Sequence, residues 1–278
     1  MKKHNLSVLF ILLPIILFSQ QNSVLWKIEK DSVASYILGT QHLFGGSFIE
    51  NDSDIFNALK NSVLIVTENI DSPYTIVEKR NSFNYIEKLS SREKSKLNEI
   101  LYEKKNINKL TLKELIGQTD KYWGRFSCLD AGEKKDTVLM DEFVKKYARN
   151  NQIKLEGLET VEQTLDAIET FVYPNFSEKQ LISILRDKLD KFSDNKSNKN
   201  CAIEEEYRTK KYSFDFSKSI NVPIITSRNQ NWLQKIPKLL EDNKKVFIAV
   251  GAGHLNFKNG LIEGLKNLGY KVTPVNLQ

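Results

Sequence analysis

The sequence predicts an α+β protein: a central mixed β-sheet with an N-terminal β-hairpin and a large, mostly helical middle segment. Apolar, strand-like runs lie near both ends of the chain, whereas residues 90–245 carry mainly helical patterns. Eight of the 12 glycines fall in residues 39–46 and 251–269, so tight turns are expected there. The composition, 40% hydrophobic and 10% aromatic, is that of a globular chain and excludes intrinsic disorder.

The N-terminal elements are two strands, a short helix and a third strand. Residues 24–29 and 34–39 are strand-like and flank a short polar stretch, so they are expected to pair as a β-hairpin. Residues 54–60 predict a short helix, and the apolar run 62–67 predicts a buried strand.

The middle segment is expected to be helical, with one strand inside it. Residues 160–163 and 177–180 both fit a capping box, in which the side chains of the first and fourth residues bond each other's backbone N–H. Residues 152–156 predict a strand before Gly157. The polar residues 191–200 lack a periodic pattern and predict a loop.

The C-terminal part alternates helices with strands. Residues 228–241 predict a helix, 245–250 a strand, 259–267 a second helix and 271–275 a last strand. Continuous apolar strands that alternate with helices indicate a sheet covered on at least one face.

The first 20 residues have the pattern of a secretory signal peptide. A basic start, Lys2 and Lys3, precedes an apolar run over residues 6–18 and a polar exit. The run is too short to span a bilayer, so we expect residues 1–20 to be removed and residues 21–278 to form a single domain. An uncleaved segment that anchors the chain to a membrane is the alternative. The sequence therefore predicts an exported protein, either periplasmic or secreted.

The charge distribution gives little support to nucleic-acid binding. The chain has 41 basic and 35 acidic residues, a net charge of +6, and the two signs alternate along helical stretches such as 178–191. No stripe of Lys and Arg with interleaved aromatic residues is present in the sequence. We therefore expect no nucleic-acid partner.

Two cysteines, Cys128 and Cys201, remain after the predicted signal peptide. An oxidising compartment would allow them to form a disulfide, and two buried free thiols are the alternative. The chain has no CxxC spacing, which argues against a cysteine-ligated zinc site.

The two histidines beyond the predicted signal peptide share one local pattern. His42 and His254 each follow a strand, lie three residues after a glycine and precede a leucine, in Gly39-Thr-Gln-His and Gly251-Ala-Gly-His. A glycine at the end of a strand permits a sharp turn, so the following side chains lie at the carboxyl edge of the sheet, where open α/β sheets bind ligands. If the two strands are neighbours, both imidazoles lie in one crevice.

A divalent metal is the ligand that this pair favours. Neutral imidazole is the commonest protein metal ligand, and Glu68, at the end of the third apolar strand, supplies a carboxylate. Glu68 would either ligate the metal or take a proton from metal-bound water. Manganese, cobalt and zinc all suit such ligands.

Other interpretations of these residues remain open. Each histidine could be a hydrogen-bonded structural residue, and Glu68 a solvated surface acid. The segment Gly251–Gly253 could be a phosphate-binding turn, although it lacks the third glycine and the lysine of such loops.

The two Gly-x-x-His motifs, with Glu68 after the intervening strand, resemble the TraB/GumN family, which also contains the animal TIKI metalloproteases. Further matches follow in order along the chain, and the resemblance covers roughly residues 24–278. These matches are Leu25-Trp26, Leu158-Glu-Thr160 with Gln163, and Ser227-Arg-Asn229 with Trp232 and Ile236.

The resemblance implies a central-sheet fold and a metal-dependent, peptidase-like activity. His42 and His254 would be metal ligands and Glu68 the essential acid. Arg228 would stabilise negative charge in the site. Three more residues would line it or serve only as caps and packing: Asn229, Glu159 and Gln163. The family usually has a glycine two residues before an aspartate in its middle helix. This chain has Leu139-Met-Asp141 there, so Asp141 is not among the predicted site residues.

The sequence thus supports two main hypotheses about function. The first is an exported, divalent-metal-dependent hydrolase that acts on a peptide or on a small ester or amide. The second is a non-catalytic protein that binds a peptide or signal in the same cleft. A role in surface polysaccharide export is suggested by the GumN name alone.

Overall fold

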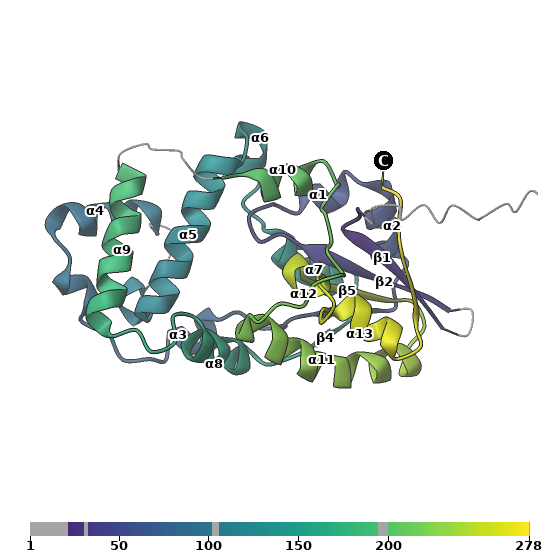
Figure 1. Ribbon diagram of the computed structural model, residues 1–278. Helices are drawn as coiled ribbons and strands as arrows, with labels where there is room; N and C mark the ends of the chain where they lie inside the picture. The colour runs from purple at the N-terminus through teal and green to yellow at the C-terminus, as the bar shows by residue number, and fades with distance from the viewer. Residues whose placement is uncertain (1–21, 31–32, 102–105, 194–199, 278) are drawn as a thin grey trace, which may run out of the picture.

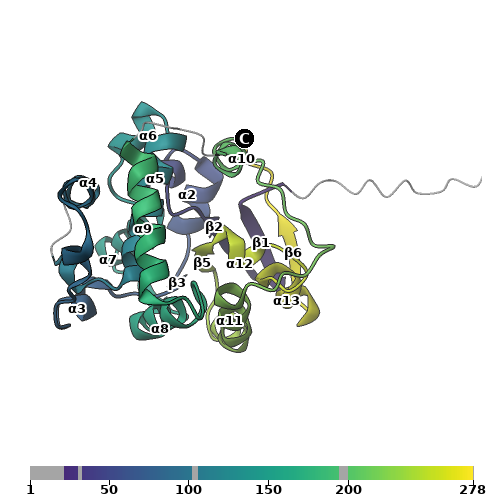
Figure 2. The ribbon, with the colours of Figure 1, turned by 60° about the vertical axis from the view of Figure 1, so that its left-hand side comes forward.

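The computed structural model describes residues 22–30, 33–101, 106–193 and 200–277, and within them it has one six-stranded sheet with helices on both faces and a helical bundle beside it (Figures 1 and 2). The predicted signal peptide, residues 1–20, lies outside the described residues. Within the part of the chain that is described, no helix is long and apolar enough to cross a membrane.

The sheet confirms the predicted α+β class and the N-terminal hairpin. Its strand order is β4-β3-β5-β2-β1-β6. The pairs β1–β2 and β1–β6 are antiparallel, and β2–β5, β5–β3 and β3–β4 are parallel, so the sheet is mixed. The strands are β1 (Leu25–Lys30), β2 (Val33–Thr40), β3 (Leu64–Thr67), β4 (Lys154–Gly157), β5 (Val246–Gly251) and β6 (Lys271–Pro274).

The two strands that precede the histidine motifs are neighbours. In the parallel β2–β5 pair, Gly39 lies opposite Val250 and Thr40 opposite Gly251. The two strands therefore end at nearly the same level, which brings both turns to one edge of the sheet as predicted.

Alternate residues of the strands enter two cores. Leu38, Ile65 and Phe247 pack under α1 (Ser47–Glu50), α2 (Ser53–Lys60) and α7 (Met140–Asn150). Their neighbours on the other face of each strand, such as Ile37, Leu64 and Ile248, pack under α11 (Pro223–Asp242) and α13 (Leu261–Asn267). This alternation follows from the two-residue repeat of a β-strand.

A third core lies inside the helical bundle, and Figure 1 shows this bundle on the left of the sheet. Leu97, Leu115 and Leu185 are among its buried residues. The bundle consists of α3 (Tyr74–Val77), α4 (Ser91–Ile100), α5 (Leu112–Cys128) and α9 (Glu178–Ser193), with 3₁₀ turns at Tyr85–Lys88 and Ile107–Lys109. Helix α8 (Val161–Phe171) contacts both α5 and α11 and so joins the bundle to the sheet. The shorter helices are α6 (Ala131–Lys135), α10 (Ala202–Arg208) and α12 (Ala252–Leu255).

Both predicted capping boxes are present, but several boundaries differ from prediction; most differ by one or two residues, and the helix α11 and the loop after α9 differ most. The boxes at residues 160–163 and 177–180 have their expected reciprocal bonds. The helix predicted for residues 228–241 already begins at Pro223, because proline suits the first helical turn. In the predicted loop 191–200, helix α9 continues to Ser193, and residues 194–199 lie outside the described residues.

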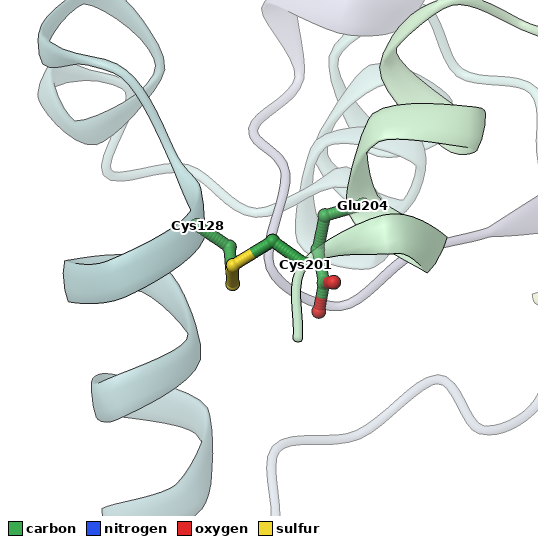
Figure 3. A group of neighbouring side chains, drawn as sticks. All are labelled: Cys128, Cys201 and Glu204. Carbon is green, nitrogen blue, oxygen red and sulfur yellow. A yellow bond between two sulfur atoms is a disulfide. The ribbon is translucent and has the colours of Figure 1, made fainter. Parts of the chain in front are cut away.

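Cys128 and Cys201 form a disulfide (Figure 3), so of the two states considered for them the bonded one is present. The bond joins the last residue of α5 to the residue before α10. Arg208 in α10 strengthens the same junction, since its guanidinium donates to the Cys128 carbonyl at 2.7 Å and to Glu133. Helix α10 is therefore fastened to the end of the bundle.

Candidate active site

The two histidine turns and Glu68 meet around Gly251. A Cβ built on Gly251 would lie 3.4 Å from Glu68 Oε1, 3.4 Å from His42 Nε2 and 3.6 Å from His254 Cδ2. Glu68 follows β3 directly, and its Oε1 accepts a hydrogen bond of 2.9 Å from the Gly251 backbone N–H. The three predicted residues are thus brought together, and glycine at position 251 leaves room between them.

Gly39, the glycine of the first histidine motif, has a different structural role. A Cβ on Gly39 would lie 3.0 Å from the Ala252 Cα and 3.0 Å from Leu255 Cδ1. Gly39 therefore permits close contact between the two turns and does not itself face the histidines.

His42 is held by a carboxylate from α7. Its Nδ1 lies 2.6 Å from Asp141 Oδ2, while Asp141 Oδ1 accepts a 2.6 Å hydrogen bond from the Thr40 hydroxyl. Because an ionised carboxylate is only an acceptor, Nδ1 carries the proton and Nε2 carries the lone pair of the neutral ring. Nε2 is the atom that faces Gly251.

The charges of this pair stabilise each other. The charge and hydrogen bond of Asp141 raise the pKa of His42 above its ordinary value, against partial desolvation of this half-exposed side chain by the surrounding protein. Burial alone would raise the pKa of the Asp141 carboxyl, but the charge and hydrogen bond of His42 and the Thr40 hydroxyl lower it far below its usual range. Asp141 is therefore ionised throughout the physiological pH range.

His254 is held by an amide from α11. Asn229 Nδ2 donates to the His254 carbonyl at 3.1 Å, which fixes its Oδ1 as the atom 2.7 Å from His254 Nδ1. His254 Nδ1 must then donate, so the neutral ring again carries its lone pair on Nε2. That atom lies 3.2 Å from Arg228 Nη1, and the ring lies against Trp232 with 4.4 Å between centroids.

Burial keeps His254 neutral. The side chain is buried, and this desolvation, with a smaller contribution from the charge of Arg228, lowers the pKa of His254 to about 4 although Glu68 opposes the shift. At neutral pH the ring is in the unprotonated form that binds metals.

Arg228 joins the two carboxylates of the site. Its Nη2 lies 2.6 Å from Glu68 Oε2 and 2.7 Å from Glu159 Oε1, and its Nε contacts both Glu159 oxygens at 3.0 and 3.1 Å. Glu159 also accepts from the Trp232 indole at 3.1 Å and from the Thr164 hydroxyl at 2.6 Å. Burial would raise the pKa of Glu68. His254, which takes up a proton only in the acidic range where this carboxyl titrates, and the charges of Arg228 and His42 outweigh burial and lower that pKa.

Gln163 is a capping residue at the margin of the site. Its Oε1 accepts from the Thr160 N–H at 2.9 Å, and its own N–H bonds the Thr160 hydroxyl. It also lines a cavity of about 540 Å³ between α8 and α11, together with Glu159 and Arg228. Of the predicted lining residues, Glu159, Arg228 and Asn229 contact the central cluster, and Gln163 does not.

The model of the TraB/PrgY/gumN family matches residues 24–274. The chain belongs to this family. No curated protein and no solved structure gives a significant match.

In this TraB/PrgY/gumN member the donor atoms suit a divalent metal. Each histidine has Nδ1 bonded to a side chain of the protein and its lone pair on Nε2, the arrangement usual for metal-ligating histidines, and Glu68 is an ionised carboxylate beside them. Arg228, however, contacts both His254 Nε2 and Glu68 Oε2. It must move from His254 for all three residues to bind one ion.

In the conformation described, the two histidines and Glu68 do not form a compact set of ligand atoms. Among the described residues, Cys128, Cys201 and Glu204 are the three potential metal-ligating side chains whose ligand atoms lie within 4.8 Å of one another (Figure 3). Its sulfur atoms form the disulfide and are not thiolate ligands. The two histidines and Glu68 lie further apart than this limit in the conformation described.

Sequence reasoning missed two residues that hold the first histidine turn. Asp141 was left out of the predicted site, yet it contacts His42 directly. Tyr207, in α10, is fully buried; its hydroxyl donates to the Gly39 carbonyl at 2.6 Å and also has a backbone hydrogen bond with Gln41. The Asp141 position could be found by its place in the family pattern, whereas no local pattern marks Tyr207.

Proposed function

We propose that this chain is a divalent-metal-dependent hydrolase with peptidase-like activity, acting on a peptide or on a small ester or amide. The observation that carries the proposal is the convergence of His42 Nε2, His254 and Glu68 Oε1 on the space beside Gly251. Manganese, cobalt and zinc all suit this mixture of imidazole and carboxylate ligands.

His42, His254 and Glu68 are the residues that would hold the metal. A bound divalent ion supplies an acidic water molecule and polarises the carbonyl group of a substrate. Asp141 and Asn229 fix the orientation of the two imidazoles through their Nδ1 atoms.

The remaining polar groups suit the handling of charge and protons. Glu68 is ionised and can accept the proton of the attacking water. Arg228, once displaced from His254 Nε2, would present its guanidinium to the negative charge that develops on a carbonyl oxygen. Glu159 accepts hydrogen bonds from Arg228 Nε and Nη2, and these bonds limit how far the guanidinium can move.

Binding without catalysis is the second candidate function. Arg228 forms ion pairs with both Glu68 and Glu159 and bonds His254, so these side chains have polar partners without a metal. A site of this kind could bind a peptide in the cavity between α8 and α11, which Glu159 and Arg228 line.

We further propose that the protein acts outside the cytoplasm, in the periplasm or after secretion. The N-terminal signal-like segment supports this location. The disulfide between Cys128 and Cys201 supports it independently, because disulfides persist mainly in oxidising compartments.

The test is hydrolysis of a fluorogenic peptide library and a matched ester by chelator-stripped protein, before and after reloading with manganese, cobalt or zinc. Turnover that requires metal and is lost in His42→Ala and Glu68→Gln variants is expected. Glu68→Gln is the conservative test of the carboxylate, since its amide oxygen can still accept from Gly251 N–H. Peptide binding without turnover under every metal would favour the second candidate.

A further inference from the structure

A second cavity lies on the bundle side of the site. It has a volume of about 370 Å³ and is enclosed by α3, α5 and α8. Apolar atoms make up most of its wall, although charged and polar side chains line it as well. The apolar side chains are those of Pro73, Val77, Leu110, Leu165, Ile168 and Val172, and the charged and amide ones are Lys113, Glu114, Gln118 and Lys121. The described helices therefore leave an apolar space of the size that small ligands occupy.

This cavity adjoins the site, because Thr164 in its wall is hydrogen-bonded to Glu159 of the site. Thr164 lines it, and its hydroxyl donates to Glu159 Oε1 at 2.6 Å and accepts from Asn69 Nδ2 at 3.3 Å. Asn69 directly follows Glu68 in the chain. Lys121 lines another part of the wall, and its charge acts on both His42 and Asp141. A molecule bound at the histidines is therefore adjacent to the apolar space.

Gly117 in the cavity wall is not explained by the packing of the protein. It lies inside the 17-residue helix α5, where glycine is unfavourable because it loses more backbone freedom on folding than alanine does. A Cβ built on Gly117 would meet nothing within 4 Å, so no neighbouring group requires a glycine there. A larger side chain would instead project into open space at the cavity wall.

We infer that this cavity is a specificity pocket for an apolar side chain, such as that of leucine or phenylalanine, of a peptide bound at His42, Glu68 and His254. Gly117 keeps the pocket open. The inference rests on the proposed function for the position of the peptide, but it does not require that the peptide be cleaved.

The size of the effect follows from burial of an apolar side chain. Transfer of one leucine or phenylalanine side chain from water into an apolar pocket strengthens binding by roughly 10- to 100-fold over alanine. Substitution of Gly117 by phenylalanine fills the space and removes this preference. Gly117→Ala adds only a methyl group and should keep it.

The experiment uses fluorescein-labelled pentapeptides of alanine in which one position at a time is leucine, phenylalanine or aspartate. Their binding to the wild type, Gly117→Ala and Gly117→Phe is measured by fluorescence anisotropy, with metal-free and with manganese-loaded protein. At one peptide position, the wild type and Gly117→Ala are expected to bind leucine or phenylalanine at least tenfold more tightly than alanine. Gly117→Phe should show less than a threefold difference.

Ile168→Asp is the second variant, because it places a charge on the opposite wall of the pocket and leaves α5 unchanged. An apolar preference that is absent in the wild type, or that persists in both pocket variants, overturns the inference. Hydrolysis is scored separately with the same peptides. A Gly117-dependent preference without hydrolysis would contradict the proposed enzymatic activity but support the specificity pocket. Hydrolysis without this preference would support the enzymatic activity but contradict the pocket.

Discussion

The two histidine turns share a sequence pattern and end neighbouring strands, but their surroundings differ. His42 is 53% exposed and paired with a carboxylate, which raises its pKa. His254 is buried, paired with a neutral amide and covered by Trp232, and its pKa is lowered to about 4. The two Gly-x-x-His motifs therefore present one histidine that gains a proton easily and one that resists it.

The Gly-x-x-His motif therefore determines where the imidazoles lie, whereas the side chains of the neighbouring helices α7 and α11 determine their charge. Asp141 comes from α7 on one face of the sheet, and Asn229 comes from α11 on the other. Asp141 and Asn229 each bond the Nδ1 of one histidine, so the Nε2 lone pair of the neutral ring faces the site. Four changes test how far the two turns are independent.

The largest expected effect is loss of the charge network on the His254 side. Arg228→Met leaves Glu68 and Glu159 without their shared cation, and their side chains are only 15% and 7% exposed. We expect the free energy of unfolding to fall by about 3–5 kcal/mol. Asp141→Asn, which breaks the more exposed pair at His42, should cost about 1 kcal/mol or less. Equal losses in urea titrations would show that the two turns are not held differently.

The second prediction concerns pH in the metal-free protein. The pKa of His254 in the folded state lies below that in the unfolded state, so the unfolded state binds its proton more readily. Stability from His254 should therefore be lost as the pH falls from about 6.5 towards 4. The raised pKa of His42 has the opposite sign: its contribution is present at low pH and is lost as the pH rises through the folded value.

Imidazole NMR signals measure both values, and a His42→Ala variant assigns them. One ring should titrate above the ordinary pKa and the other only near pH 4. Two rings with the same ordinary pKa would remove the electrostatic difference between the turns.

Removal of the disulfide should act mainly on the first turn. Cys128 and Cys201 are 73 residues apart, and loss of their bond by a double serine substitution should cost about 2–4 kcal/mol. The bond holds α10 in place, and Tyr207 of α10 donates a hydrogen bond to the Gly39 carbonyl. Amide hydrogen exchange in residues 39–44 should therefore accelerate more than in residues 251–255. Tyr207→Phe is the control that removes the hydroxyl alone. Equal acceleration of exchange in both segments would contradict a local effect of the disulfide on the first histidine turn.

The last prediction concerns metal affinity. Asp141→Asn and Asn229→Ala each remove an orienting partner of a histidine, and such changes typically weaken metal binding by about 10- to 100-fold. Isothermal titration with manganese, cobalt and zinc measures the change. Lys60→Ala, on the surface helix α2, serves as a control that should bind as the wild type does. An unaltered affinity in both site variants would place the metal elsewhere.

Much of the site could be predicted from sequence because its main residues follow local patterns. His42, His254 and Glu68 each lie just after a recognisable strand, so the sheet edge brings them together. Asp141 could not be derived in this way, since its contact with His42 spans 99 positions and depends on how α7 packs.

The boundaries that were missed have a similar cause. Helix α11 begins at Pro223, but the preceding Val222 has no side-chain acceptor to cap it, so the usual start signal is absent. The class of the fold needed only the alternation of strands and helices, and that part of the prediction was confirmed.

The central claim is that both histidines hold one divalent metal. The most direct measurement is the thermal stability of the chelator-stripped protein during titration with manganese, cobalt and zinc, beside a His42→Ala/His254→Ala double variant. A ligand that binds only the folded state adds about 2.7 kcal/mol of stability at a hundredfold excess over its dissociation constant. We expect the melting temperature of the wild type to rise and that of the double variant to stay unchanged. No rise with any of the three metals, or an equal rise in both proteins, would contradict it.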